Sequence, residues 1–423
     1  MYLSQDKGMG SRRDLVVIGA TGYTGKLICE HLARRQLEEK FTWAISGRSS
    51  SKLAELRASL LESVPGASFD IVTCDLEDLT QLSDTVKEFN VVISAAGPYA
   101  QMGSKLVQAC VEQRTHYCDI TGEVWWVKQM IQRFHEPAEK NRIKIVSCCG
   151  FDSIPSDLGS FFLAKEVFSQ FGVPVDAIES SQECVGGVSA GTVHSLVGAF
   201  ESPWSERWDM LRSKYLILSG PALAQEGLDI DWIPSFDRDL NSWKSFFVMS
   251  LINSRVVIRS VELWKRSSKS NVFSSDFRYH EYGSYGKGIA GFFTSLTVLV
   301  VFFLLGILLP IKPFANFLKS KFPSGYGPSE ETRKSGWFKT YQKATFKDKS
   351  GQTRSLRSVV VGGEPGYAVT SILVAESGIC LSKNASGGIG TPEIPGGVLT
   401  PSVAMGQPLL DQLNANGVKF SLV

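Results

Sequence analysis

The chain has 423 residues, too many for one ordinary domain and enough for two or three domains with hydrophobic cores. Apolar residues make up 43% and charged residues 20%, which is typical of folded proteins and excludes a disordered chain. The 44 basic and 42 acidic residues leave a net charge of +2, so electrostatics gives no reason to expect a nucleic-acid partner.

Strand-like and helical segments alternate through the first third of the chain. Short apolar runs predict strands at 14–19, 41–46, 69–74, 91–96, 117–119 and 144–148. Helical periodicity between them predicts helices at 26–35, 51–61, 79–89, 104–113 and 127–140. This alternation indicates βαβ units, so we expect an α/β, Rossmann-type domain with a doubly wound parallel sheet over residues 12–150.

The pattern changes after Gly150. Glycine-rich turns, tryptophans and irregular loops over 151–287 indicate a second, mixed α/β domain that would hold the substrate. Residues 288–311 form an apolar segment that is expected to associate with a membrane. The C-terminal part, 312–423, contains strand-like runs at 340–346 and 354–361 and a helical pattern at 367–381, and we expect it to pack back on the fold.

A glycine-rich turn joins the first predicted strand to the first predicted helix. Glycines three residues apart allow a tight turn, a close approach of the backbone to a pyrophosphate, and close packing of the helix on the strand. The helix N-terminus offers N–H groups and a partial positive charge to the phosphates, whereas the alternative is a turn without a ligand. The predicted cofactor-binding residues of the turn are Gly19, Thr21, Gly22, Tyr23, Thr24 and Gly25.

The end of the second predicted strand favours NADP(H) over NAD(H). An NAD-preferring site places a carboxylate here for the ribose 2′-hydroxyl, and none occurs between Lys40 and Lys52. Arg48 and Ser49 would instead bind a 2′-phosphate, since a guanidinium forms paired hydrogen bonds with phosphate oxygens. The alternative for Arg48 is a solvated surface side chain.

Three further residues complete the predicted cofactor site. Asp75 follows the third strand and would contact the adenine or cap the next helix. Ala96 and Gly97 follow the fourth strand, where small residues would let a ribose lie against the backbone.

The eight cysteines form no C-x-x-C pair and no Cys/His cluster with zinc-ligand spacing, so no metal site is predicted. Adjacent Cys148 and Cys149 are expected to be buried thiols in a reducing compartment, and a redox pair is the weaker alternative.

Several longer motifs follow in order along the chain, at 19–25, 47–48, 97–99, 115–123, 149–159, 327–338, 365–370 and 396–401. With them the chain resembles the saccharopine dehydrogenase-like oxidoreductases, and within that group the branch called trans-acting enoyl reductases. The resemblance covers nearly the whole chain. It implies a Rossmann domain, an inserted substrate domain and, often, association with membranes or lipid droplets, but it supplies no agreed catalytic residue.

Candidates for the reaction are therefore argued from residue types near predicted strand ends and glycine turns. Hydride transfer needs a proton donor or a polarising group near the acceptor. The candidates are Tyr99, His116, Tyr117, Asp119, Asp152, Ser153 and His194. We select Asp152, Ser153 and Tyr99, which follow the sixth and fourth predicted strands, as the catalytic set lining the nicotinamide pocket. The alternative is that Asp152 and Ser156 cap the next helix, and that the lone His194 is structural.

The apolar segment contains 22 uncharged residues from Gly288 to Leu309, enough for a helix of about 33 Å, near the ~30 Å thickness of a hydrocarbon layer. A buried core helix is the alternative. A span would place the C-terminal part opposite the cofactor domain, and basic residues flank the segment equally on both sides. We therefore expect insertion into one leaflet, with the protein facing the cytoplasm at a lipid droplet or organelle membrane in a eukaryote, or at the inner membrane of a bacterium.

The sequence thus predicts an NADPH-dependent, membrane-associated reductase of a small-molecule or lipid-linked apolar acceptor, with an enoyl double bond in (glyco)lipid synthesis as one substrate; a homodimer is left open. A non-catalytic dinucleotide-binding membrane or lipid-droplet protein is the first alternative. A saccharopine dehydrogenase-type amino-acid oxidoreductase is the second. It would need an arginine cluster for the substrate carboxylates, and Arg255, Arg259 and Arg266 fit an ordinary amphipathic element instead.

Overall fold

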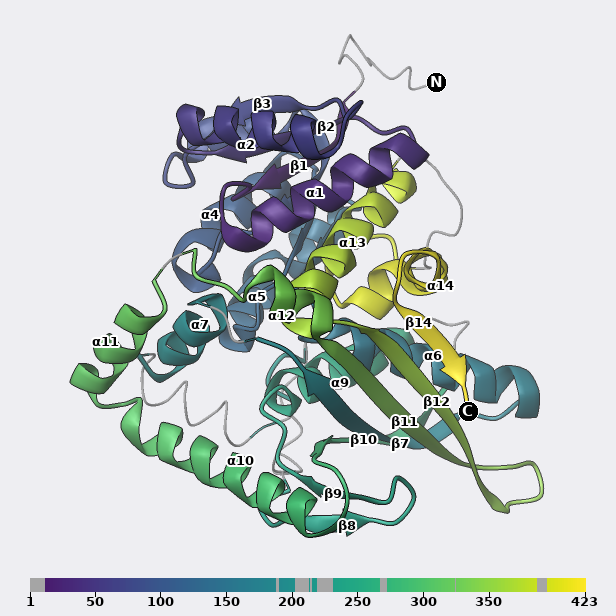
Figure 1. Ribbon diagram of the computed structural model, residues 1–423. Coiled ribbons are helices and arrows are strands. Elements are labelled where there is room, and N and C mark those ends of the chain that lie inside the picture. The colour runs from purple at the N-terminus through teal and green to yellow at the C-terminus, as the bar shows by residue number, and fades with distance from the viewer. Residues whose placement is uncertain are drawn as a thin grey trace, which may run out of the picture.

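The computed structural model describes residues 12–187, 190–201, 213, 215–218, 231–266, 272–323, 325–385 and 394–423. Within these residues the chain forms two seven-stranded sheets, with sheet A in the upper half of Figure 1 and sheet B in the lower half. Strands of both sheets and the helices between them contribute to one continuous hydrophobic cluster. The two sheets are therefore packed together through a shared core.

Sheet A is the predicted doubly wound parallel sheet, with strand order β13-β6-β5-β4-β1-β2-β3. Its first strands are β1 Arg13–Ile18, β2 Trp43–Gly47, β3 Asp70–Thr73, β4 Phe89–Ser94, β5 His116–Asp119 and β6 Lys144–Val146. The helices between them are α1 Tyr23–Glu38, α2 Ser50–Ser63, α3 Leu79–Val86, α4 Tyr99–Glu112 and α5 Val124–Lys140. Successive strands are added in one direction from β1 to β3 and in the other from β4 to β6, so the switch point lies between β1 and β4, where doubly wound sheets bind nucleotides.

One strand of sheet A was not predicted. β13, Gly397–Leu399, pairs in parallel with β6 and comes from the far end of the chain. The Val398 backbone N–H donates to His135 Nδ1 on α5 at 3.2 Å. A strand of three residues carries too little periodicity to be recognised, so only its partners reveal it.

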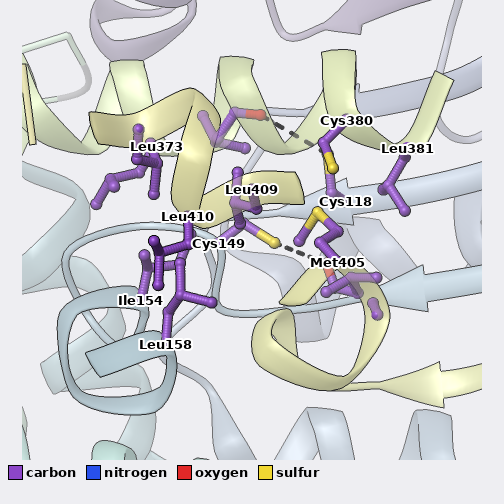
Figure 2. Close-up of a cluster of buried hydrophobic side chains, with 14 of the residues drawn as sticks. Cys118, Cys149, Ile154, Leu158, Leu373, Cys380, Leu381, Met405, Leu409 and Leu410 are labelled. Carbon is purple, nitrogen blue, oxygen red and sulfur yellow. Dashed lines mark hydrogen bonds between the residues drawn. The ribbon is translucent and has the colours of Figure 1, made fainter. Parts of the chain in front are cut away.

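C-terminal helices cover the α1 side of sheet A. α13, Thr370–Ala385, packs against α1, β4 and β5, and α14, Pro401–Ala415, packs against α13 and α6. Figure 2 shows α13 and α14 side chains, among them Leu373 and Leu409, packed on Cys118 and Cys149 at β5 and β6. Cys148 and Cys149 are both free and buried, as expected.

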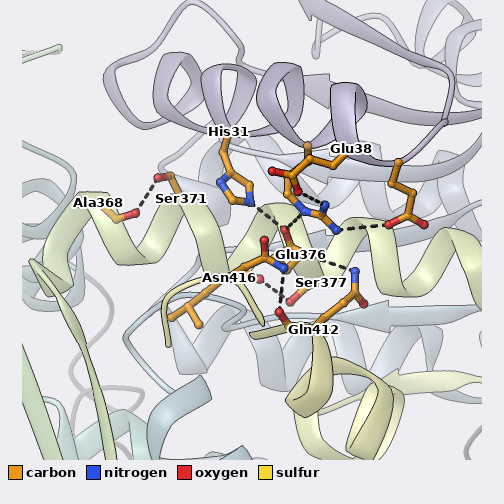
Figure 3. A network of polar contacts seen from close by, with 11 residues as sticks. His31, Glu38, Ala368, Ser371, Glu376, Ser377, Gln412 and Asn416 are labelled. Atoms are coloured by element: carbon orange, nitrogen blue, oxygen red, sulfur yellow. Dashed lines mark hydrogen bonds and ion pairs between the residues drawn. The ribbon is translucent and has the colours of Figure 1, made fainter. Parts of the chain in front are cut away.

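A buried ion-pair network joins α1, α13 and α14 (Figure 3). Glu376 on α13 is fully buried and accepts hydrogen bonds from His31 Nε2 at 2.7 Å and Arg35 Nε at 2.8 Å. Its second oxygen accepts a hydrogen bond from Gln412 on α14 at 2.9 Å. The N-terminal and C-terminal parts of the chain are thus connected through the middle and the last turn of α1.

Sheet B is the predicted mixed sheet, with order β14-β12-β11-β7-β10-β9-β8. β7 and β10 are parallel, and the other neighbours are antiparallel. The strands are β7 Val175–Val185, β8 Ser235–Asp237, β9 Ser242–Ser245, β10 Phe273–Ser284, β11 Trp337–Lys347, β12 Thr353–Gly363 and β14 Lys419–Leu422. Helices α6, Ile154–Phe171, and α9, Ser250–Arg266, pack on this sheet.

The remaining helices include two, over 288–308 and 312–321, that lie at the lower left edge of the molecule (Figure 1). α10, Gly288–Leu308, is the predicted apolar helix and packs along β9 through Trp243–Phe292 and Phe246–Phe302 ring contacts. The others are α7 Ala190–Glu201, α11 Lys312–Lys321 and α12 Glu330–Ser335. The predicted helix at 367–381 is divided into a π-helical turn, η1 Pro365–Val369, and α13.

Candidate functional site

The glycine-rich turn has the geometry expected of a dinucleotide site. Gly19 has a φ of +82°, and a Cβ there would lie 2.9 Å from the carbonyl carbon of Ala95 at the end of β4. A Cβ on Gly25 would lie 2.2 Å from the oxygen of Gly19, so only glycine lets α1 pack this close to β1. Gly22, by contrast, is exposed, and among the described residues other than its chain neighbours only the Gly19 oxygen, at 3.3 Å, lies within 4 Å of its Cβ position.

The N-terminus of α1 is free to bind an anion. Gly22 is its N-cap residue, so no side chain caps the helix, and the first turn contains no acidic residue. The leading N–H groups of the helix and its partial positive charge therefore favour a phosphate. Thr24 lies in this first turn and is half-buried, and the Thr21 hydroxyl lies 3.8 Å from the Cβ position of Gly47, which brings the end of β2 against the turn.

Arg48 follows β2 at the edge where an adenosine ribose would lie. The side chain is exposed and has no hydrogen-bond or ionic partner among the described residues. Ser49 caps α2, with its hydroxyl accepting from the Lys52 N–H at 3.4 Å. A free guanidinium at the end of β2, where no carboxylate occurs, fits a 2′-phosphate.

Asp75 does not cap α3. That position belongs to Asp78, which accepts from the N–H groups of Thr80 and Gln81 at 3.0 Å, whereas Asp75 accepts from the Glu77 N–H at 3.1 Å in the preceding turn. The capping alternative for Asp75 is therefore wrong.

Small residues at the end of β4 leave the backbone accessible beside the glycine turn. The Ala95 N–H donates to the Ile18 oxygen at 2.8 Å, and the Ala96 Cβ lies 3.0 Å from the Cβ position of Gly19. Ala96 is half-buried and Gly97 is exposed. The small residues leave room for a ribose beside Ala96, and the Tyr99 ring lies next to Gly97, 3.4 Å from its Cβ position.

The motif at 115–123 organises neighbouring loops. His116 Nδ1 accepts from the Lys144 N–H at 3.0 Å, and burial, together with the charges of Lys144 and Arg12, lowers the pKa of His116 to about 4. Burial raises the pKa of Asp119 to about 7, and the carboxyl group accepts from the Thr121 and Cys148 N–H groups. Both side chains have structural partners, but only Asp119 lies at the carboxyl edge of the sheet, since His116 is the first residue of β5.

Glu123 ends this motif and caps α4. Its two carboxylate oxygens accept from the backbone N–H groups of Tyr99 at 3.0 Å and Ala100 at 2.9 Å. α4 consequently starts at Tyr99, earlier than the predicted 104. The Tyr99 ring is buried and its hydroxyl donates to the Ser94 oxygen at 3.0 Å; Tyr117 is also buried.

Asp152 and Ser153 lie directly after β6, at the same edge of the sheet. Asp152 is half-buried and accepts no hydrogen bond from a described residue, and burial of its carboxyl group raises its pKa to about 7. The N-cap residue of α6 is Ser153, without a side-chain capping bond, so the interpretation of Asp152 as a helix cap is wrong. Ser156 is likewise not a cap, because its hydroxyl donates to Glu281 at 2.9 Å.

A buried polar network fixes Ser153 and was not predicted. Its hydroxyl donates to Asn253 Oδ1 at 3.1 Å, and Asn253 Nδ2 donates to Glu281 Oε1 at 3.0 Å. Glu281 also accepts from Gln182 at 2.5 Å, and burial raises its pKa to about 7. These residues come from α6, α9, β7 and β10, so no local pattern could have joined them.

The remaining candidates lie away from this edge or have other partners. His194 on α7 contacts the Phe322 oxygen at 2.9 Å. Arg255 and Arg259 are buried on α9, where Arg255 donates to the Ser213 oxygen at 3.0 Å and Arg259 pairs with Glu262 at 2.6 Å. Arg266 pairs with the same glutamate at 3.0 Å.

The turn is also contacted by two distant segments. The Tyr23 hydroxyl donates to the Pro328 oxygen at 2.6 Å and accepts a hydrogen bond from Arg333. The Tyr23 ring meets the Tyr367 ring edge-on, with centroids 4.7 Å apart. Segment 327–333 and η1, both parts of the longer sequence motifs, therefore enclose the first turn of α1.

Comparison with known proteins agrees with this site. Residues 15–146 match the family model described as the saccharopine dehydrogenase NADP binding domain. A trans-acting enoyl reductase of Mycobacterium ulcerans is 30% identical over 425 residues, which cover 96% of this chain and 97% of that protein. A saccharopine dehydrogenase-like oxidoreductase of Bos taurus is 30% identical over 437 residues, covering 97% of each.

Among solved structures, saccharopine dehydrogenase (L-Glu forming) from Saccharomyces cerevisiae is similar, with a TM-score of 0.57 and 13% identity over 97% of this chain and 100% of that one. This likeness shows the fold alone. The fold, the matched domain and the full-length relatives together define an NADP-dependent oxidoreductase. The chain belongs to the saccharopine dehydrogenase-like oxidoreductase family.

Proposed function

We propose that this oxidoreductase is a membrane-associated, NADPH-dependent reductase of an apolar or lipid-linked acceptor, and that the bond reduced is an enoyl double bond in (glyco)lipid synthesis. The name of the Mycobacterium ulcerans relative, trans-acting enoyl reductase, supports the reduction of an enoyl double bond as the reaction class. The observation that carries the membrane and lipid part is the exposed apolar surface of α10.

α10 is long and apolar enough to cross a membrane, yet only 11% of its most apolar window is buried. Ile289 is 77% exposed, Phe293 59% and Phe303 65%. A core helix of a soluble protein would bury these side chains, because each apolar Å² removed from water contributes roughly 25 cal/mol. An apolar surface of this length in contact with water favours a lipid environment for the helix.

The sheet topology supports insertion into one leaflet rather than a span. β10 precedes α10 and β11 follows it, and both pair with β7 in sheet B. A single crossing would place β10 and β11 on opposite sides of the bilayer, which is incompatible with their shared partner. Lys287 and Lys321, on either side of the apolar run, would lie at the headgroups of the same leaflet.

Binding to sealed vesicles tests the membrane part. We expect the protein to bind vesicles, with Lys287 and Lys321 labelled from the same side, and Phe293→Asp to release it. Leu37→Asp is the matched control, since Leu37 is a similarly exposed apolar residue at 55%, on α1. Labelling of the two lysines from opposite sides would contradict one-leaflet insertion.

We place the membrane-bound protein in a reducing compartment, facing the cytoplasm at a lipid droplet or organelle membrane of a eukaryote or at the inner membrane of a bacterium. Free cysteines support this, because an oxidising compartment would select for disulfides. A homodimer stays a prediction.

For the reaction, Asp152 is the strongest of the proposed catalytic residues. NADPH supplies the hydride, and the acceptor then needs a proton. Asp152 follows β6 at the cofactor edge, has no hydrogen-bond partner among the described residues, and has a pKa raised to about 7 by burial, so it holds a proton near neutral pH. Ser153, whose buried hydroxyl donates to Asn253, would position the neighbouring Asp152, and the Tyr99 hydroxyl is bonded to the Ser94 backbone oxygen.

NADPH consumption over an acceptor panel separates the candidate functions. Enoyl thioesters, enoyl lipids in detergent micelles and saccharopine should be compared with purified protein. We expect turnover with the enoyl compounds. Cofactor binding without turnover on any acceptor would favour a non-catalytic dinucleotide-binding membrane protein, and turnover on saccharopine alone would favour the amino-acid oxidoreductase. The engagement of Arg255 and Arg259 within the fold argues against that last outcome.

A further inference from the structure

Segment 327–333 lies on the cofactor turn although it is about three hundred positions away in sequence. The Tyr23 ring packs on Gly327, where an added Cβ would lie 2.5 Å from the ring carbon Cζ. The Tyr23 hydroxyl is bonded to the Pro328 oxygen and to Arg333, whose guanidinium lies 5.6 Å from the ring centroid. Tyr23, in the first turn of α1, therefore holds Arg333 beside the N-terminus of that helix.

The guanidinium of Arg333 forms no ion pair within the described part of the chain, although its charge influences the exposed Glu330 on the same helix. Its Nη1 donates to the Tyr23 hydroxyl and to the Pro328 oxygen at 3.1 Å, both neutral acceptors, and no described carboxylate pairs with it. On the same short helix, Glu330 pairs with Lys334 at 2.7 Å. Arg333 is half-buried, so its charge is partly removed from water.

The N-terminus of α1 presents the same lack of a counter-charge, since its first turn has no acidic residue and no side-chain cap. Arg333 is linked to this helix end through the Tyr23 side chain, and a half-buried cation near a helix N-terminus is stabilised by an anion that lies within reach of both. The family's dinucleotide places its pyrophosphate at this helix end.

We propose that Arg333 is a further cofactor-binding residue that contacts the pyrophosphate of NADP(H), positioned by Tyr23. This rests on the proposed use of the α1 turn as the cofactor site. The pyrophosphate is assigned rather than the 2′-phosphate because Arg333 lies at the first turn of α1, whereas Arg48 lies at the end of β2, where the ribose is bound. The Rossmann domain would then depend on a segment from the C-terminal part for full affinity.

Calorimetric titrations of the full-length protein test this assignment. We expect Arg333→Ala to weaken the binding of NADPH and of NADH by the same factor, about tenfold or more, because a charge-assisted hydrogen bond is lost. Arg48→Ala should weaken the binding of NADPH and leave the binding of NADH unchanged. Lys334→Ala, which removes an exposed neighbouring cation on α12, is the matched control and should leave both affinities unchanged.

Two fragments of the cofactor distinguish which phosphate each arginine binds. Adenosine 2′-monophosphate keeps the 2′-phosphate and carries no phosphate at the 5′ position, so its affinity should fall in Arg48→Ala and stay unchanged in Arg333→Ala. Inorganic pyrophosphate should compete with NADPH more weakly in Arg333→Ala than in wild type. Arg333→Lys keeps the charge and should recover part of the affinity, which covers the case of an alanine variant that misfolds. Unchanged dinucleotide affinity in both Arg333 variants, with binding abolished in Gly22→Val, would overturn the assignment alone. Binding retained in Gly22→Val would overturn the cofactor site itself.

Discussion

Replacing Glu376 with glutamine should weaken the contact between α13 and the second half of α1. The Glu376 carboxylate is fully buried and accepts two hydrogen bonds on one oxygen, from His31 and Arg35, and one on the other, from Gln412 (Figure 3). Glutamine has nearly the same shape, so the variant removes the charge and keeps the packing.

The size of the effect follows from the bonds that change. A hydrogen bond to a charged group contributes about 1.5–3 kcal/mol and a neutral one about 1 kcal/mol. Two bonds to Glu376 lose their charge assistance, while Arg35 keeps its pairs with Glu38 and Glu39. We therefore expect the free energy of unfolding to fall by about 1–3 kcal/mol at pH 7.

The effect should depend on pH in a defined direction. Burial would raise the pKa of Glu376, but the hydrogen bonds and charges of His31 and Arg35 outweigh it and hold the pKa below the ordinary 4.5. A carboxyl group with a lowered pKa in the folded state stabilises the fold above its unfolded pKa and loses that contribution as pH falls through the folded value. The difference between wild type and Glu376→Gln should therefore be full at pH 7 and shrink below about pH 4.5.

Urea unfolding followed by tryptophan fluorescence measures this difference as a shift in the transition midpoint. Glu38→Gln is the matched control, because Glu38 pairs with the same arginine but is 68% exposed, and exposed pairs contribute little. Equal midpoints for wild type and Glu376→Gln at pH 7, or an equal loss in the control, would refute the reasoning.

Three further predictions concern the cofactor and the reaction. Arg48→Ala should weaken NADPH by a factor of about ten or more and leave NADH unchanged in a calorimetric titration, because it removes a charge-assisted phosphate contact; equal wild-type affinity for both cofactors would contradict this. Gly22→Val should fold, since the site around its Cβ is open and its φ of −69° and ψ of 166° suit valine, yet bind neither cofactor; unchanged circular dichroism with normal binding would show that the turn is only structural. Asp152→Asn should lower kcat about 100-fold or more, and the decline of wild-type activity above pH 7, where the proton donor ionises, should be absent from the variant's pH profile.

Secondary structure and residue roles that depend only on nearby residues in the sequence could be predicted. The strand before Gly19 and the helix after it carry their own hydrophobic periodicity, and the roles of Gly19, Gly22 and Gly25 follow from spacing, because the turn is built within seven residues. Helix starts were less accurate. α4 begins at Tyr99 because Glu123, a residue of the next loop, caps it.

Interactions across the fold were outside the reach of such patterns. Ser153 was singled out by its place after β6, but its partners Asn253 and Glu281 come from α9 and β10. Motif 327–338 was recognised as a motif without a role, and only its contact with Tyr23 indicates one.

The sequence by itself determined the class of the first domain, the position of its cofactor turn, the preference expected from Arg48 and the apolar character of α10, because each depends on residue types within about twenty positions of one another. The tertiary structure decided that β13 completes sheet A, that α10 leaves its apolar side chains exposed, and that Arg333 lies at the first turn of α1. These features depend on which distant surfaces meet when the core is buried. The packing of the whole chain decides which surfaces meet, and the hydrophobic periodicity of a single segment does not reveal it.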